Sequence, residues 1–308
     1  GKSLKKNNEN IKKNIYLIIF DAAAPIEKFD NLYDTNYINK YKDFYQENGF
    51  VYSQGNKSAY NNTKHNLASF FYLNYHIDEK NYKSVKFRNI WPYFLKKNST
   101  NYLPFLEVLK KNQYKFVHYG NMFNDCYSVN DDYCFDKDNK KIKSYYYSSY
   151  ISFSFLNRSP IFPIFKRIET VLMSENSILE ETNYVQLFYK KNDSIKRFMN
   201  DINGLDFKIA NKGYFFLIHS MMPHGPYIYN ADCSFNDELK DVDLNDQLLK
   251  DKKIFETNFN YSLYKKSYAC MLKRINEFIL FLNEKDPDAN VVITADHGTP
   301  IINSEEDK

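Results

Sequence analysis

Short apolar runs recur along the chain at wide intervals. The runs are Ile15 to Phe20, Lys115 to Tyr119, Tyr214 to His219 and Asn290 to Thr294. Each has the length of a strand rather than of a helix. Apolar runs of this length are typical of strands that are buried on both faces of a parallel sheet.

Between these runs, apolar residues recur with the period of an amphipathic helix. The clearest stripe steps by four and three residues through Tyr264, Tyr268, Met271, Ile275, Phe278 and Leu282. Such a stripe places one apolar face of a helix against a core. Buried strands separated by amphipathic helices predict an α/β fold, a three-layer α/β/α sandwich with a central, mostly parallel sheet.

No internal repeat and no linker divides the chain. We therefore expect one domain over residues 14–308, preceded by a basic N-terminal segment or linker over residues 1–13. Two charged stretches, Asn139 to Lys143 and Lys240 to Lys253, are expected to be solvated surface.

Composition narrows the class of partner. Aromatic residues make up 18% of the chain, but the formal net charge is only +4. A surface that stacks on bases needs aromatics beside a clustered basic face, so we expect no nucleic-acid binding.

No apolar run approaches the about 20 residues that cross a bilayer. The sequence begins with Gly1 and a basic stretch, and we expect an upstream signal or membrane anchor to have been removed.

Two of the predicted strands end in side chains that can bind a metal, at the edge of an α/β sheet where ligands gather. Asp21 directly follows the first apolar run, and Asp296-His297-Gly298 follows the last. Taken singly, Asp21 is better explained as a helix cap. Asp296 and His297 can reach one cation only where the chain turns sharply, which Gly298 permits. A strand-end turn with an exposed histidine is the alternative.

A third segment contains two of the six histidines of the chain. His219 and His224 lie five residues apart, and the segment between and after them is rich in proline and glycine. Because proline and glycine exclude a regular helix, we expect a rigid loop here. Imidazoles on such a loop suit proton transfer or contacts to phosphate or sulfate, although structural histidines are an alternative.

The fourth segment contains Thr63, which follows an asparagine-rich loop and precedes an apolar helical pattern that starts at Leu67. The N–H groups and the dipole at a helix N-terminus favour an anion such as a phosphoryl group. A hydroxyl there becomes a nucleophile if a metal or a base lowers its pKa. A threonine that simply caps the helix is the alternative.

The order of these four segments resembles the sulfatase-like branch of the alkaline phosphatase superfamily. The shared features are an aspartate at the first strand end, a hydroxyl residue at a helix start, the PHGP loop of residues 223–226 and DHG after a late strand. The resemblance covers residues 14–300 and extends, more distantly, to lipoteichoic acid synthases and phosphoethanolamine transferases. It implies an alkaline-phosphatase-like fold.

The resemblance also implies a single divalent metal ion held by Asp21, Asp296, His297 and the Thr63 oxygen. Thr63 would be the nucleophile and would carry a covalent phospho-intermediate. His224, together with His219, would stabilise charge or protonate the leaving group. Three oxygens and one nitrogen suit zinc or manganese better than magnesium or calcium. The implied activity is transfer or hydrolysis of a phosphoryl or phospho-substituted group on a cell-envelope phospholipid or glycan.

The chain departs from this family at three places. Sulfatases oxidise a cysteine or serine to an aldehyde, which Thr63 cannot become, so sulfate-ester hydrolysis by that route is disfavoured. A second aspartate often follows the first in sulfatases, whereas three alanines follow Asp21, which points to one metal. The chain stops at Lys308, soon after DHG, and we expect the C-terminal part of the domain to be missing.

Four cysteines, Cys126, Cys134, Cys233 and Cys270, match no zinc-binding spacing and by themselves allow three pairings or none. Relatives in the family commonly work outside the cytoplasmic membrane. The resemblance therefore implies the disulfides Cys126–Cys134 and Cys233–Cys270. It also implies an extracytoplasmic location, in the periplasm or at the cell surface, as the soluble domain of a membrane-anchored protein.

Two alternatives to phosphoryl transfer remain open at this point. One is a sulfate-ester hydrolase of the same superfamily that uses an unmodified threonine. The other is a degenerate domain that binds an envelope glycan or a partner protein without turnover. Convergence of Asp21, Thr63, Asp296 and His297 on one point would favour an enzyme over a degenerate domain.

Overall fold

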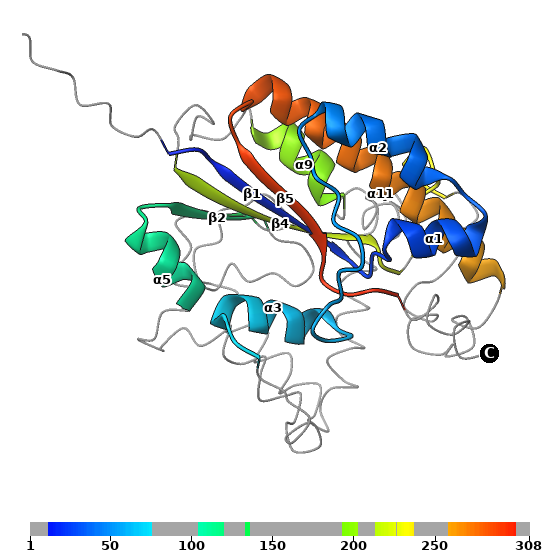
Figure 1. Cartoon of the computed structure of the whole chain (residues 1–308), viewed down its shortest axis with the longest axis horizontal. Helices are drawn as coiled ribbons and strands as arrows, with labels where there is room; N and C mark the ends of the chain where they lie inside the picture. The colour runs from blue at the N-terminus through cyan, green and yellow to red at the C-terminus, as the bar shows by residue number, and fades with distance from the viewer. Residues whose placement is uncertain are drawn as a thin grey trace, which may run out of the picture.

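A computed structural model describes residues 12–75, 104–119, 133–135, 193–202, 213–225, 227–236 and 258–299. These residues form a five-stranded sheet in the order β3-β2-β4-β1-β5. Every neighbouring pair of strands is parallel. Helices lie on both faces of the sheet (Figure 1). The predicted α/β class with a parallel sheet is therefore confirmed.

The longer strands lie where the apolar runs predict them. They are β1 (Ile15–Asp21), β2 (Lys115–Tyr119), β4 (Tyr214–Pro223) and β5 (Asn290–Ala295). A short fifth strand, β3 (Tyr133–Phe135), was not predicted. β4 is longer than predicted, because it continues past His219 to Pro223, where we expected a loop. All ten of its residues are buried, so the expected histidine loop begins only at His224.

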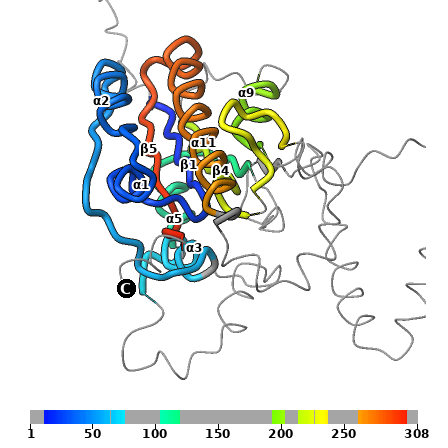
Figure 2. The backbone as a smooth tube through the Cα atoms, turned by 90° about the vertical axis from the view of Figure 1, so that its right-hand side faces the viewer, coloured from blue at the N-terminus to red at the C-terminus, as the bar shows by residue number. Residues whose placement is uncertain are grey.

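The helices divide into two groups on opposite faces of the sheet. Their bounds are α1 (Ile26–Tyr33), α2 (Tyr37–Glu47), α3 (Thr63–Tyr72), α5 (Pro104–Lys111), α9 (Ser194–Asp201) and α11 (Asn258–Lys285). α1, α2, α9 and α11 cover one face, whereas α3 and α5 lie on the other (Figure 1). The view in Figure 2 shows the same two groups from the side.

Successive residues of each central strand contribute to cores on opposite sides of the sheet. In β1, Tyr16 and Ile18 pack in the core with α9 and α11, whereas Leu17 and Ile19 pack in the core with α3 and α5. β4 alternates in the same way. Because helices cover both faces, apolar side chains are needed at every position, and this requirement explains the continuous apolar runs in the sequence.

The long helix α11 carries the predicted apolar stripe. All six predicted residues, from Tyr264 to Leu282, are buried against the sheet. α11 is also joined covalently to the segment that follows β4, through a disulfide between Cys233 and Cys270. This disulfide was predicted and is confirmed.

Several predictions concern residues outside the described part of the chain. They are the pairing of Cys126 with Cys134, the charged stretches Asn139 to Lys143 and Lys240 to Lys253, and most of the basic N-terminal segment. No helix within the described residues combines the length and the apolar character needed to cross a bilayer.

Candidate metal centre

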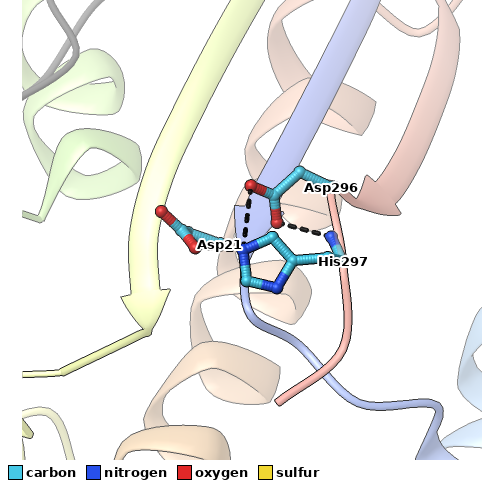
Figure 3. Close-up of side chains that lie close together, drawn as sticks. All are labelled: Asp21, Asp296 and His297. Carbon is cyan, nitrogen blue, oxygen red and sulfur yellow. Dashed lines mark hydrogen bonds and ion pairs between the residues drawn. The ribbon is translucent and has the colours of Figure 1, made fainter. Parts of the chain in front are cut away.

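Three potential metal ligands meet at the carboxyl ends of two neighbouring strands. Asp21 is the last residue of β1, and Asp296 and His297 directly follow β5. The two strands run parallel, with Phe20 opposite Ala295, so their ends lie side by side. The ligand atoms of Asp21, Asp296 and His297 all lie within 4.8 Å of one another. Figure 3 shows the three side chains gathered at this edge of the sheet.

Thr63 adds a hydroxyl group to this site from α3, which lies on the other face of the sheet from α1, α2, α9 and α11 (Figure 1). Its Oγ1 lies 3.3 Å from Oδ2 of Asp21 and 3.3 Å from Nε2 of His297. Thr63 is the first residue of α3, and the N-cap is Asn62, whose side chain accepts a hydrogen bond from the His65 N–H. Thr63 therefore does not cap the helix, and its buried hydroxyl faces the carboxylates instead.

The carboxylate of Asp21 does not cap a helix either. The N-cap position of α1 is Pro25, which makes no side-chain hydrogen bond. Oδ1 of Asp21 and Oδ2 of Asp296 are both buried, and neither accepts a hydrogen bond from a described residue. A buried, unsatisfied carboxylate oxygen is costly. A cation bound between these two oxygens would remove that cost.

The spacing of the four side chains fits one tetrahedral cation. Ligands about 2.1 Å from a tetrahedral zinc lie about 3.4 Å from each other. Nε2 of His297 is 3.4 Å from Oδ1 of Asp21 and 3.7 Å from Oδ2 of Asp296. The Thr63 hydroxyl lies 3.3 Å from His297 Nε2, also close to this value, and 3.3 Å from the other carboxylate oxygen of Asp21, Oδ2. Asp21, Asp296 and His297 could therefore hold a metal ion, with the Thr63 oxygen beside it.

The orientation of His297 leaves its ligand nitrogen facing the carboxylates. Nδ1 donates a hydrogen bond to the carbonyl oxygen of Gly298 at 2.6 Å, which directs Nε2 toward Asp21 and Asp296. A histidine that binds a metal is commonly held in this way by its other nitrogen.

The ionisable groups of the site shift one another's pKa. Burial would lower the pKa of His297, but contact with Asp21 and the charge of Asp296 raise it to about 9. Burial and the charge of Asp21 raise the pKa of Asp296. Burial opposes ionisation of Asp21, but contact with His297 lowers its pKa overall. Without a metal, the site therefore has a protonated His297 imidazole between the carboxyl groups of Asp21 and Asp296.

The chain bends at Asp296 and His297 as expected, but the residue with a left-handed backbone at the site is Ala22 and not Gly298. Ala22 has a φ of 58°, in the left-handed region, whereas Gly298 is not among the residues with positive φ. The Ala22 N–H donates to Oδ1 of Asp296 at 3.1 Å, and the His297 N–H donates to the same oxygen at 2.7 Å. Asp296 thus binds both strand ends through one oxygen and faces the ligand group with the other.

One of the two predicted histidines, His219, lies beside the potential metal ligands. His219 lies within β4, and its Nε2 is 4.0 Å from Oδ2 of Asp296. Burial lowers the pKa of His219, which keeps its imidazole neutral near pH 7. His224 is exposed just beyond the strand, with Nδ1 donating to the Gly225 carbonyl at 2.6 Å.

A third histidine near the site was missed by the sequence analysis. His118 is buried in β2 opposite Leu217 of β4, two residues before His219. The sequence feature that could have identified His118 is its position as a polar residue near the carboxyl end of an otherwise apolar run. We had treated that run only as a strand.

The sequence matches no protein-family model, and no match was found among curated proteins or solved structures.

Proposed function

We propose that this chain is a metal-dependent enzyme that transfers or hydrolyses a phosphoryl or phospho-substituted group, with Thr63 as its nucleophile. The observation that carries the proposal is the position of the Thr63 hydroxyl, 3.3 Å from both Asp21 and His297 at the start of α3. The spacing agrees with the ligand set that the sulfatase-like branch of the alkaline phosphatase superfamily implies, and we propose an alkaline-phosphatase-like fold on the same basis.

A metal held by Asp21, Asp296 and His297 would lower the pKa of the Thr63 hydroxyl and neutralise the non-bridging oxygens of the substrate. The imidazole favours zinc or manganese over magnesium or calcium. Thr63 Oγ1 forms a bond to phosphorus, its proton passes to solvent, and the bond between phosphorus and the leaving oxygen breaks. Water or a second alcohol then attacks phosphorus, and Thr63 leaves and regains a proton.

The two histidines suit different parts of this reaction. The lowered pKa of His219 makes it a neutral hydrogen-bond donor, suited to a substrate oxygen that gains charge. His224 is exposed and is suited to give its proton to the leaving oxygen. The first turn of α3 adds N–H groups and a helix dipole beside the reacting anion.

The substrate class and the location rest on the family resemblance together with the disulfide. A disulfide between Cys233 and Cys270 supports an oxidising compartment outside the cytoplasm, in the periplasm or at the cell surface. In that compartment, phospholipid head groups and envelope glycans are the available phosphate esters. We propose one of these as the substrate, with a membrane surface reached through an anchor.

The test combines metal analysis with intact-mass measurement. The protein is loaded with zinc or manganese and incubated with phosphatidylethanolamine, phosphatidylglycerol or an aryl phosphodiester. We expect one metal ion per chain and a phospho-adduct on Thr63. The isosteric variant Thr63→Val should lose the adduct and keep the fold, whereas Ser69→Ala, which removes another hydroxyl of α3, should keep the adduct.

Two results would count against the proposal in different ways. A chain that binds metal but forms no adduct and turns over none of the substrates would be a domain that binds a glycan or a partner protein. Turnover of an aryl sulfate in place of the phosphodiester would favour the sulfate-ester hydrolase. Absence of metal binding would remove the basis of both enzyme mechanisms.

A further inference from the structure

The three alanines after Asp21, residues 22–24, form a turn. This turn connects the end of β1 to Asp296 in the candidate metal centre. Ala22 adopts a left-handed conformation with a φ of 58°. Its N–H group donates to Oδ1 of Asp296 at 3.1 Å. L-amino acids other than glycine rarely adopt this conformation without support from their surroundings. The conformation of Ala22 therefore requires contacts that hold it.

Those contacts come from two tyrosines of α11, on the opposite face of the sheet from α3. The Tyr264 hydroxyl donates to the Ala22 carbonyl at 3.1 Å and accepts from the Ala24 N–H at 3.2 Å. The Tyr268 hydroxyl donates to the Ala24 carbonyl at 2.8 Å. Each hydroxyl satisfies backbone groups of a segment that is itself buried.

Both tyrosines are completely buried, with none of their surface exposed. Burial raises the pKa of each hydroxyl well above its ordinary value, so the hydroxyls keep their protons and can donate. The ring of Tyr268 stacks on Phe29 of α1 with centroids 3.8 Å apart, which fixes its position further. The two hydroxyls are therefore fixed partners for the turn.

We propose that Tyr264 is a positioning residue of the metal centre. Its hydroxyl bridges the Ala22 carbonyl and the Ala24 N–H and so keeps Ala22 in the conformation that holds Asp21 and Asp296 at ligand distance. The inference rests on the metal centre of the proposed function, although the geometry of the turn itself does not require a metal. Tyr264 touches neither metal nor substrate.

The test removes the hydroxyl and keeps the ring. Tyr264→Phe leaves the Ala22 carbonyl and the Ala24 N–H without their partner, and we expect zinc binding to weaken by about tenfold. The matched control is Tyr16→Phe. Tyr16 is equally buried, and its hydroxyl bonds Oδ2 of Asp286 at 3.2 Å near the opposite end of β1. The control should be destabilised to a similar extent and keep the zinc Kd within about twofold.

A second measurement separates this inference from the metal proposal. Selective 15N-alanine labelling allows amide hydrogen exchange at Ala22 to be followed by NMR in the metal-free protein. We expect exchange to be faster by about tenfold in Tyr264→Phe than in Tyr16→Phe. If the wild-type chain binds no zinc but Ala22 exchange responds in this way, the metal proposal fails and the positioning role stands.

Wild-type exchange at Ala22 in Tyr264→Phe would overturn the inference, whether or not zinc binds. An unchanged zinc Kd in a chain that binds zinc would also overturn it. If Tyr264→Phe does not fold, Tyr268→Phe takes its place, because that variant removes only the bond to Ala24. It should weaken zinc binding and speed Ala22 exchange by about threefold, and wild-type values in both measurements would contradict the proposal.

Discussion

Asp296 illustrates how much one side chain contributes to the candidate metal centre. Its Oδ1 accepts the N–H groups of Ala22 and His297, and its Oδ2 lies among the potential ligands. The first interaction joins the ends of two strands, and the second provides a negative charge for a cation. Because one residue does both, its substitution would disturb backbone and ligand geometry together.

A glycine in a recurring motif is often assumed to be needed for its backbone freedom. Gly298 does not have a positive φ, and a Cβ there would meet no atom within 4 Å. We therefore expect Gly298→Ala to change the free energy of unfolding by less than about 0.5 kcal/mol. Zinc affinity should also be retained, and urea denaturation with zinc titration would check both.

Gly213 provides the matched control for this prediction. It precedes β4 with a φ of 98°, where an alanine is strained. Gly213→Ala should lower the free energy of unfolding by about 1–2 kcal/mol. Equal effects of the two substitutions would show that the local backbone at Gly298 is more constrained than its φ indicates.

At the scale of residues, the sequence predicts the potential ligands better than it predicts the residues that support them. Asp21, Asp296 and His297 could be found because each follows an apolar run, where a polar side chain is conspicuous. Tyr264 was predicted only as part of an apolar stripe, because the sequence does not reveal that its hydroxyl meets Ala22. His118 was missed because a single histidine in an apolar run resembles a core residue.

At the scale of elements, a buried ion pair connects α11, α9 and β4. Arg274 of α11 donates to Oδ2 of Asp193 at 2.6 Å, and Oδ1 of Asp193 caps α9 by accepting from the Lys196 N–H. The next residue, Ser194, donates to the His219 carbonyl at 2.9 Å. The orientation of His219 is thus linked to a helix on the far face of the sheet.

Removing either partner of this pair should destabilise the fold. Arg274→Met leaves a buried carboxylate and should lower the free energy of unfolding by about 3–5 kcal/mol. Asp193→Asn should cost less, because Arg274 keeps its ion pair with the partly exposed Glu277. The double variant should lose clearly less than the sum of the two, because neither partner is then left uncompensated. Urea denaturation of the four proteins gives the coupling energy.

The neighbouring residue Lys273 offers a control for this cycle. Its contact with Glu277 is 4.0 Å long and both side chains are partly exposed. Lys273→Met should change stability by less than about 1 kcal/mol. Strict additivity of the Arg274 and Asp193 substitutions would mean that the pair contributes nothing beyond its separate side chains.

The elements themselves were predicted with uneven success. β1 and β2 could be located because strands covered on both faces must be apolar throughout, whereas β5 is an edge strand with alternately exposed residues that still has an apolar run. The extension of β4 could not, because Pro223 and the nearby glycine and proline argue locally for a loop. Strand order could not be predicted either. β1 pairs with strands that start about 200 and 275 residues further along the chain, and local sequence carries no record of such pairings.

At the scale of the whole molecule, the candidate metal centre joins the first described strand to the last. The bond between Ala22 and Asp296 spans 274 residues. A metal bound there would link the ends of two neighbouring strands, β1 and β5, only in the folded state. Zinc at about 100 times its Kd should therefore raise the free energy of unfolding by about 2.7 kcal/mol.

Denaturation with and without zinc measures this effect. The variant Asp296→Asn removes one ligand charge and should show little or no increase in stability with zinc. An increase of the same size in both proteins would place the bound zinc somewhere else. Loss of the increase in Asp296→Asn alone would tie the effect to this site.

The position of β1 in the sheet also has a consequence for synthesis of the chain. β1 is translated well before both of its neighbours in the sheet, β4 and β5. A nascent chain therefore carries an apolar strand with two open edges for much of its translation, a state prone to association with other chains. Chaperone capture of the early chain is the expected safeguard, and the metal ligands meet only after β5 has been made.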